Sequence, residues 1–137
     1  MKLKVDNKSD FSIDLDIFQK VNKVVALQEQ ISENQEVSLA ITNSDKIQKL
    51  NKRFRGKDAK TDVLSFPSYI DFIPFLGDII IDIEVANSQK GNNSLEEELQ
   101  YLYLHGLLHL MGYDHMQKKD AIIMNDKEKK YLKEIGR

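Results

Sequence analysis

Cysteine is absent from the 137 residues of this chain, and long apolar runs are absent too. Without cysteine there is no disulfide framework, no cysteine-ligated zinc site and no thiol nucleophile. Each apolar run is far shorter than the roughly 20 residues that a membrane helix needs. The opening stretch, MKLKVDNKSD, lacks the apolar h-region of a signal peptide. These absences are compatible with a reducing compartment, and we expect a cytoplasmic protein that does not contact a membrane.

Charge of one sign is not in excess either, because 20 Lys and Arg residues oppose 22 Asp and Glu residues, for a formal net charge of −2. The overall charge therefore gives no indication of a nucleic-acid-binding protein. The distribution is uneven, however, since cationic side chains crowd a single stretch. They are Lys46, Lys49, Lys52, Arg53, Arg55, Lys57 and Lys60. This run is compatible with a local basic patch and equally with an ordinary solvated helix face.

Length and composition, with 41% apolar and 31% charged residues, are typical of one globular domain covering residues 1–137. Alternating apolar residues predict strands, and apolar residues at helical spacing predict helices. The predicted strands are 2–6, 37–41, 62–66 and 78–83. The predicted helices are 14–31, Ser44 (as N-cap) to Gly56, Ser94 to Gly112, and 117–135. This order predicts an α+β fold in which a mixed β-sheet of about four strands packs with helices.

All three histidines of the chain lie in the segment HGLLHLMGYDH. His105 and His109 are four residues apart on a predicted helix, so their rings project from one face with Cβ atoms about 5–6 Å apart. Gly112 can adopt the left-handed conformation that ends a helix, which lets the chain present His115 from another direction. Three such nitrogens leave a fourth coordination position open for water, as in catalytic zinc sites. The segment therefore predicts a zincin-like site for one Zn²⁺ on a helix and the following turn, with a water molecule activated for hydrolysis.

Two neighbours of the histidines bear on the nature of this site. Asp114 would close a structural site if it were a fourth ligand, or would orient one of the histidines if it were not. The spacing also matches the metzincin motif H-E-x-x-H-x-x-G-x-x-H. Gly106 stands where that motif has its general-base glutamate, so protease chemistry lacks its proton acceptor.

Three segments together resemble a known family. The histidine segment is similar to the H-G-x-L-H-L-x-G-Y-D-H signature of the YbeY endoribonucleases. Residues 55–67, RGKDAKTDVLSFP, resemble that family's R-x-K-D-x-x-T-D-V-L-S-F-P stretch, and residues 76–79, LGDI, resemble its L-G-D-I strand. The segments occur in the order that the family has.

The resemblance implies a zinc-dependent, single-strand-specific endoribonuclease of the bacterial cytoplasm, acting in maturation of the 3′ end of small-subunit ribosomal RNA and in ribosome quality control. Its implied partners are single-stranded and ribosomal RNA, with ribosomal proteins or ribosome-associated factors as further candidates. It implies His105, His109 and His115 as metal ligands and Arg55 as a functional residue of the cleft. We hypothesise that Arg55 and His109 are catalytic, because a guanidinium fork matches two phosphoryl oxygens. From the residues alone, a surface arginine in a basic helix end is the favoured interpretation of Arg55.

Two other functions stay open at this point, a metalloprotease-like hydrolase and a non-catalytic, zinc-stabilised module that binds a ribosome or a protein. RNA would need cationic contacts along its backbone and exposed aromatic rings for its bases. Tyr69, Phe72 and Phe75, in the predicted loop 68–75, are candidates for stacking, and core packing explains them equally well.

Overall fold

The computed structural model describes residues 1–70 and 72–137 and contains, within them, four strands and five helices. The strands are β1 (Lys2–Asn7), β2 (Glu36–Thr42), β3 (Val63–Pro67) and β4 (Phe75–Asp82). The helices are α1 (Asp16–Gln28), α2 (Ser44–Arg55), α3 (Ile83–Gln89), α4 (Leu95–Leu110) and α5 (Lys118–Glu134). The predicted α+β class is confirmed, and α3 is the one described element that the prediction lacks.

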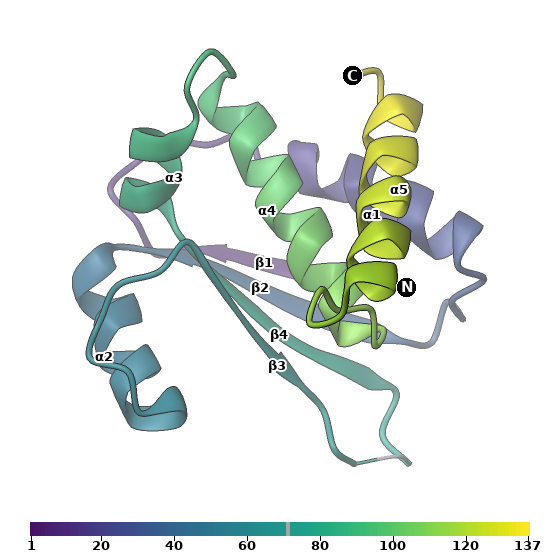
Figure 1. Cartoon of the computed structure of the whole chain (residues 1–137), viewed down its shortest axis with the longest axis horizontal. Coiled ribbons are helices and arrows are strands. Elements are labelled where there is room, and N and C mark those ends of the chain that lie inside the picture. Colours follow the sequence, from purple (N-terminus) through teal and green to yellow (C-terminus); the bar gives the residue numbers. More distant parts are fainter. Residues whose placement is uncertain (71) are drawn as a thin grey trace.

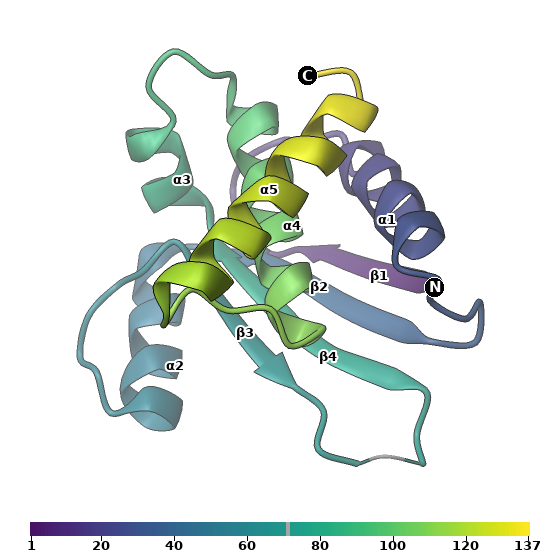
Figure 2. The same cartoon turned by 45° about the vertical axis from the view of Figure 1, so that its right-hand side comes forward.

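The four strands form a single mixed sheet in the order β1-β2-β4-β3. β1, β2 and β4 run parallel, whereas β3 pairs antiparallel with β4 and forms one edge. Figures 1 and 2 show α4 lying across one side of the sheet with α1 and α5 beside it, while α2 lies on the other side. The edge strand β3 therefore runs between α4 and α2, and this arrangement positions the functional site.

Alternation along the central strands places their apolar side chains on the face that α4 covers. Leu39 and Ile41 of β2, with Ile79 of β4, are at most 1% exposed and belong to the same core cluster as the buried leucines of α4. α4 approaches the sheet closely because Gly106 faces it. A Cβ added at Gly106 would lie 3.0 Å from Ile79 Cγ2 and 3.0 Å from Ser65 Oγ, so a larger residue would push helix and sheet apart.

The end of β4 differs from the prediction. The strand begins at Phe75 and ends at Asp82, and α3 follows at once. The Asp82 carboxylate accepts hydrogen bonds from the backbone N–H groups of Glu84 at 3.0 Å and Val85 at 3.1 Å. The isoleucine-rich run across this boundary has a high strand propensity, so the sequence predicts a strand through Ile83. The structure shows instead that Asp82 caps a helix that begins at Ile83.

The end of α1 and the start of α2 also differ from the prediction. α1 ends at Gln28, before the predicted residue 31. The N-cap of α2 is Asn43, and Ser44 lies in the first turn instead. The Ser44 hydroxyl donates to Asp82 Oδ2 at 2.7 Å, so this side chain joins α2 to the start of α3 rather than capping its own helix.

Candidate metal centre

Helix α4 begins and ends at the predicted residues, and this places its histidines. Ser94 Oγ accepts from the backbone N–H of Glu97 at 3.1 Å, and the Glu97 carboxylate accepts from the backbone N–H of Ser94 at 2.9 Å, which completes the capping box. Gly112, with a φ of +97°, follows the helix and turns the chain back. The predicted break after the second histidine is therefore confirmed.

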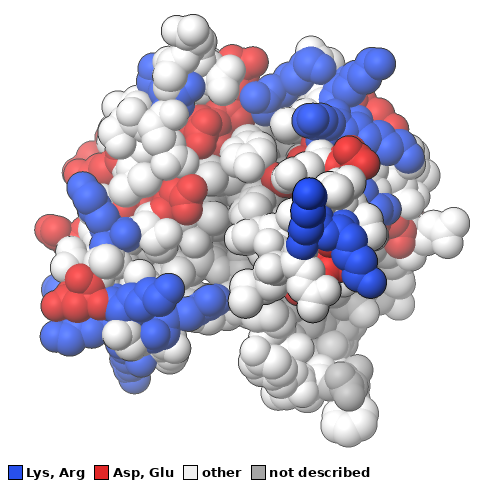
Figure 3. All heavy atoms as spheres, viewed as in Figure 1, with Lys and Arg blue, Asp and Glu red and all other residues white. Residues whose placement is uncertain are grey.

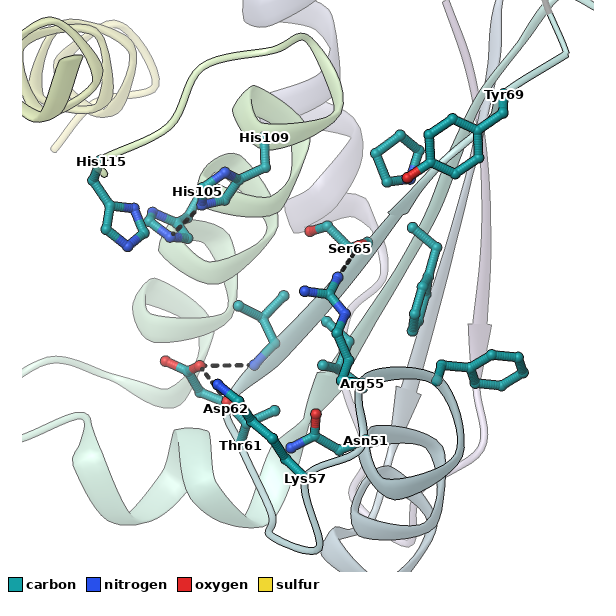
Figure 4. A pocket seen from close by; sticks show the side chains of 15 residues that line it. Asn51, Arg55, Lys57, Thr61, Asp62, Ser65, Tyr69, His105, His109 and His115 are labelled. Carbon is teal, nitrogen blue, oxygen red and sulfur yellow. Dashed lines mark hydrogen bonds between the residues drawn. The ribbon is translucent and has the colours of Figure 1, made fainter. Parts of the chain in front are cut away.

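The three imidazoles converge on one point. His105, His109 and His115 each offer a ring nitrogen, and these nitrogens all lie within 4.8 Å of one another. The Nε2 atoms of His105 and His109 are 3.1 Å apart. Two nitrogens that each bind one tetrahedral zinc ion at 2.0–2.1 Å are separated by about 3.3 Å. Donor type and spacing therefore fit a single metal ion, and Figure 4 shows the three rings gathered on one wall of a pocket.

Asp114 does not join this group. Among the described residues, the cluster that can hold a metal consists of the three histidines without a carboxylate. Asp114 Oδ1 instead accepts from the backbone N–H of Met116 at 3.1 Å within the loop. The candidate donor set is thus three imidazoles, which would leave one position of a tetrahedral ion for a non-protein ligand.

Glu128 of α5, rather than Asp114, lies where a side chain can orient one of the histidines. Its Oε2 lies 3.1 Å from His105 Nδ1, and the residue is only 4% exposed. A carboxylate at this place holds the ring proton on Nδ1 and leaves the Nε2 lone pair free toward the metal position. Nothing in the spacing of Glu128 along α5 distinguishes it from the neighbouring acidic residues, so sequence reasoning missed it.

The protonation of His109 also favours metal binding. Its pKa is lowered from the ordinary value of 6.5, first because partial burial disfavours the charged ring, and then because His105 and His115 lie close by. The neutral ring that a metal requires is therefore favoured at neutral pH.

The loop that carries His115 is tied to two distant helices. The Tyr113 hydroxyl donates to Glu29 Oε1 at 2.8 Å, and Lys127 Nζ donates to Glu29 Oε2 at 2.8 Å. The Tyr131 hydroxyl also donates to Glu29 Oε2. We call Glu29, Tyr113, Lys127 and Tyr131 the Glu29 network. It joins the end of α1, the histidine loop and α5, and no local sequence signal announces it.

A cleft of about 910 Å³ opens beside the histidines along β3. Figure 3 shows this face hollowed between the basic side chains of α2 and the helices opposite. Arg55, at the end of α2, lines the cleft with the three histidines. Its Nη2 donates to the Ser65 carbonyl oxygen at 2.6 Å, and its Cζ lies 5.3 Å from the centre of the Phe66 ring. The arginine predicted from the sequence is therefore held on the wall opposite the histidines (Figure 4).

Residues of the segment 55–67 and of the predicted loop 68–75 divide between this cleft and the rest of the fold. Thr61, Asp62 and Ser65 line the cleft, as does Tyr69. Phe75 lies in β4 rather than in a loop. Of the basic run, only Arg55 and Lys57 are among the described lining residues. The basic run is thus mostly a solvated helix face with one end turned into the cleft.

Comparison with known proteins shows which family this chain belongs to. The model of the family described as Endoribonuclease YbeY matches residues 4–136. The chain belongs to the YbeY endoribonuclease family. Membership supports a role as a nuclease acting on RNA, and it accounts for all three segments that resemble the family.

Named YbeY proteins match over most of their length. Endoribonuclease YbeY of Finegoldia magna is 41% identical over 99% of this chain and 95% of that protein. Endoribonuclease YbeY of Bacillus licheniformis is 40% identical over 86% of this chain and 83% of that protein. The solution structure of TM1509 from Thermotoga maritima is 29% identical and covers 97% of this chain and 88% of its own, with a TM-score of 0.66. Within the described residues of this YbeY chain, no helix is both long enough and apolar enough to cross a bilayer.

Proposed function

We propose that this YbeY-family chain is a zinc-dependent endoribonuclease for single-stranded RNA, built as one domain over residues 1–137. It acts in the cytoplasm, in maturation of the 3′ end of small-subunit ribosomal RNA and in ribosome quality control, with ribosomal proteins or ribosome-associated factors as further partners. One observation carries the enzymatic part of the proposal. Three converging imidazoles and a cationic guanidinium lie on opposite walls of the same cleft.

His105, His109 and His115 would hold the ion, and their donor chemistry suits zinc. When bound, zinc would lower the pKa of a coordinated water molecule to about 7 and would polarise a phosphoryl oxygen. Glu128 keeps the His105 ring oriented toward the ion through its 3.1 Å contact with Nδ1. The protein contributes a fixed donor set and leaves one face of it open to the cleft.

Arg55 would stabilise the charge that develops on the phosphoryl oxygens. Cleavage of a phosphodiester places negative charge on these oxygens, and a guanidinium can donate two parallel hydrogen bonds to them. The backbone carbonyl oxygen of Ser65 accepts one hydrogen bond from the Arg55 guanidinium, and the Phe66 ring lies beside the guanidinium carbon. These contacts restrict the side chain, so less conformational entropy is lost when the phosphate is bound.

Proteolysis finds no support at position 106. Gly106 packs against Ile79 and Ser65 and is not among the described residues that line the cleft. The general-base glutamate of a metzincin would occupy this place, and here even a Cβ meets the sheet at 3.0 Å. The cleft therefore suits a phosphoryl substrate, which Arg55 can contact, better than a peptide substrate.

The test measures bound zinc and cleavage of single-stranded RNA by the wild type, His109→Ala, Arg55→Ala and the control Arg53→Ala. Arg53 is exposed on the same helix and is not among the lining residues. We expect His109→Ala to lose both zinc and cleavage. We expect Arg55→Ala to keep zinc and to lose about 100-fold in kcat, as when one charge-stabilising donor is removed.

Wild-type cleavage by a zinc-free His109→Ala protein would refute the metal mechanism. Equal cleavage by Arg55→Ala and Arg53→Ala would remove the role of Arg55 and leave the metal mechanism standing. Isolated small ribosomal subunits serve as a second substrate, so that a requirement for a ribosomal partner is included in the comparison.

A further inference from the structure

The side chain of Tyr69 is largely exposed to solvent and also lines the cleft. The residue is 89% exposed, yet it lines the same cleft as Arg55 and the three histidines. Figure 4 shows its ring at the rim of the cleft beyond Arg55, at the end away from Lys57. Ile70, Phe72 and Ile73 are exposed in the same loop, and several exposed apolar side chains beside a cleft indicate a surface that binds something.

The ring of Tyr69 is also uncommitted inside the protein. Across residues 1–70 and 72–137, no aromatic or cationic side chain stacks on it, whereas the other two aromatic rings of the cleft are already in use. Phe54 and Phe66 contact each other with ring centres 5.7 Å apart, and Arg53 and Arg55 lie against them. Among the described residues, Tyr69 is therefore the lining tyrosine or phenylalanine whose ring has no aromatic or cationic partner.

Positive charge and an exposed aromatic ring follow one another along the cleft wall. Lys57 and Arg55 provide positive charge, and Tyr69 follows beyond Arg55 (Figure 4). A phosphate held by Arg55 would bring the base of an adjacent nucleotide to the rim. Aromatic rings stack on bases of any identity, because each base has a π-face.

We propose that Tyr69 forms a base-stacking subsite for one unpaired nucleobase next to the phosphate that Arg55 contacts. This inference rests on the proposed RNA cleavage and adds to it a source of selectivity. A base in a duplex is stacked on its neighbours and paired, so it cannot reach the ring without being unstacked. An unpaired base can, and the subsite favours single strands without favouring a particular sequence.

Phe72 offers a matched control in the same loop. It is 95% exposed, and it is not among the lining residues that the structure describes. Replacing Phe72 removes an exposed aromatic ring of similar size from the loop while leaving the cleft wall intact.

The experiment measures affinity for a short, 5′-labelled single-stranded RNA by fluorescence anisotropy, with a chelator present to prevent cleavage. The proteins are the wild type, Tyr69→Ala, Tyr69→Phe and Phe72→Ala. A series of further RNAs has the same sequence, and each lacks the base of a different single nucleotide. Removing one base-stacking side chain weakens binding by roughly 5- to 150-fold, from about 1–3 kcal/mol per base.

We expect Tyr69→Ala to bind the intact RNA about tenfold more weakly, and Tyr69→Phe and Phe72→Ala to bind like the wild type. With the base removed at the stacking position, we expect all four proteins to bind equally. Wild-type affinity of Tyr69→Ala, or the same loss on intact and base-free RNA, would overturn the subsite. So would an equal loss in Phe72→Ala, which would assign the affinity to the whole loop tip. If the wild type neither binds nor cleaves RNA, the proposed function itself fails, whereas binding and cleavage that ignore Tyr69 refute the subsite alone.

Discussion

Glu128 and His105 form the contact that sets the direction of one proposed zinc ligand. The carboxylate is 4% exposed and lies 3.1 Å from Nδ1 of the ring. Burial of the Tyr101 hydroxyl and then the nearby charge of Glu128 raise the pKa of Tyr101 to about 12. In the proposed metal centre, Glu128 would therefore act through His105, as a positioning residue.

Replacing Glu128 by Gln should lower zinc affinity by about 10- to 100-fold, because the amide holds the Nδ1 proton less strongly. Competition with a chromophoric chelator measures this affinity without any RNA. Glu134→Gln, an exposed change on the same helix, should leave the affinity unchanged. Equal zinc affinities for the two variants would show that Glu128 does not position the ligand.

Gly106 is the residue at which the zincin-like spacing and the fold meet. Alanine there gains about 1 kcal/mol of helix propensity over glycine. The added Cβ, however, meets Ile79 Cγ2 and Ser65 Oγ at 3.0 Å, and overpacking of this kind costs about 1–3 kcal/mol. We expect Gly106→Ala to be destabilised or at best unchanged in urea unfolding, and Gly106→Glu to be destabilised much more. A stable Gly106→Glu protein would show that the helix and sheet have room for the metzincin residue.

At the scale of elements, the Glu29 network holds the histidine loop against α1 and α5. Burial raises the pKa of Glu29, but the hydrogen bonds from Lys127, Tyr131 and Tyr113 together lower it below the ordinary value of 4.5. The stabilisation from this carboxylate is therefore present above pH 4.5 and is lost as the pH falls through the lowered pKa. The anchor of the loop is an interaction that acid removes.

Glu29→Gln should lower the free energy of unfolding at pH 7 by about 1.5–3 kcal/mol, the range for hydrogen bonds to charged groups. Urea unfolding of the metal-free protein at a series of pH values measures the difference from the wild type. The two curves should converge as the pH falls below the lowered pKa of Glu29. Glu33→Gln, an exposed neighbour, provides the control, and a difference from wild type that is independent of pH would contradict the role of the charge.

At the scale of the whole molecule, a net charge of −2 conceals an uneven distribution of charge over the surface. Figure 3 shows basic side chains gathered over α2 at one border of the hollowed face. Two of these cations, Arg55 and Lys57, line the cleft. RNA binding by such a surface depends on salt, since each phosphate contact releases counterions.

Lys57→Ala should weaken single-stranded RNA binding by a similar factor for every sequence. It should also reduce the slope of log affinity against log salt by about 0.7, the value for one contact to a single strand. Titrations over roughly 50–200 mM salt measure this slope. Lys129→Ala on α5, exposed and outside the cleft lining, should keep the wild-type slope, and an identical slope for both variants would exclude a phosphate contact by Lys57.

Much of the fold and of the metal centre could be predicted because the signals are local. The spacing of His105 and His109 sets their common face, and the capping box at Ser94 sets where α4 begins. The alternation of β2 likewise predicts its buried face. Helix α3 escaped prediction, because the cap of Asp82 acts only after β4 has ended.

The sequence by itself determined which side chains can meet a metal, since a helical turn and a glycine break act over a few residues. Only the tertiary structure decided what surrounds them. Glu128 reaches His105 across 23 positions, and Glu29 reaches Tyr113 across 84. Arg55 faces the histidines because β3 lies between α2 and α4. Contacts of this range depend on how helices pack on a sheet, and that packing is a property of the whole core rather than of any local pattern.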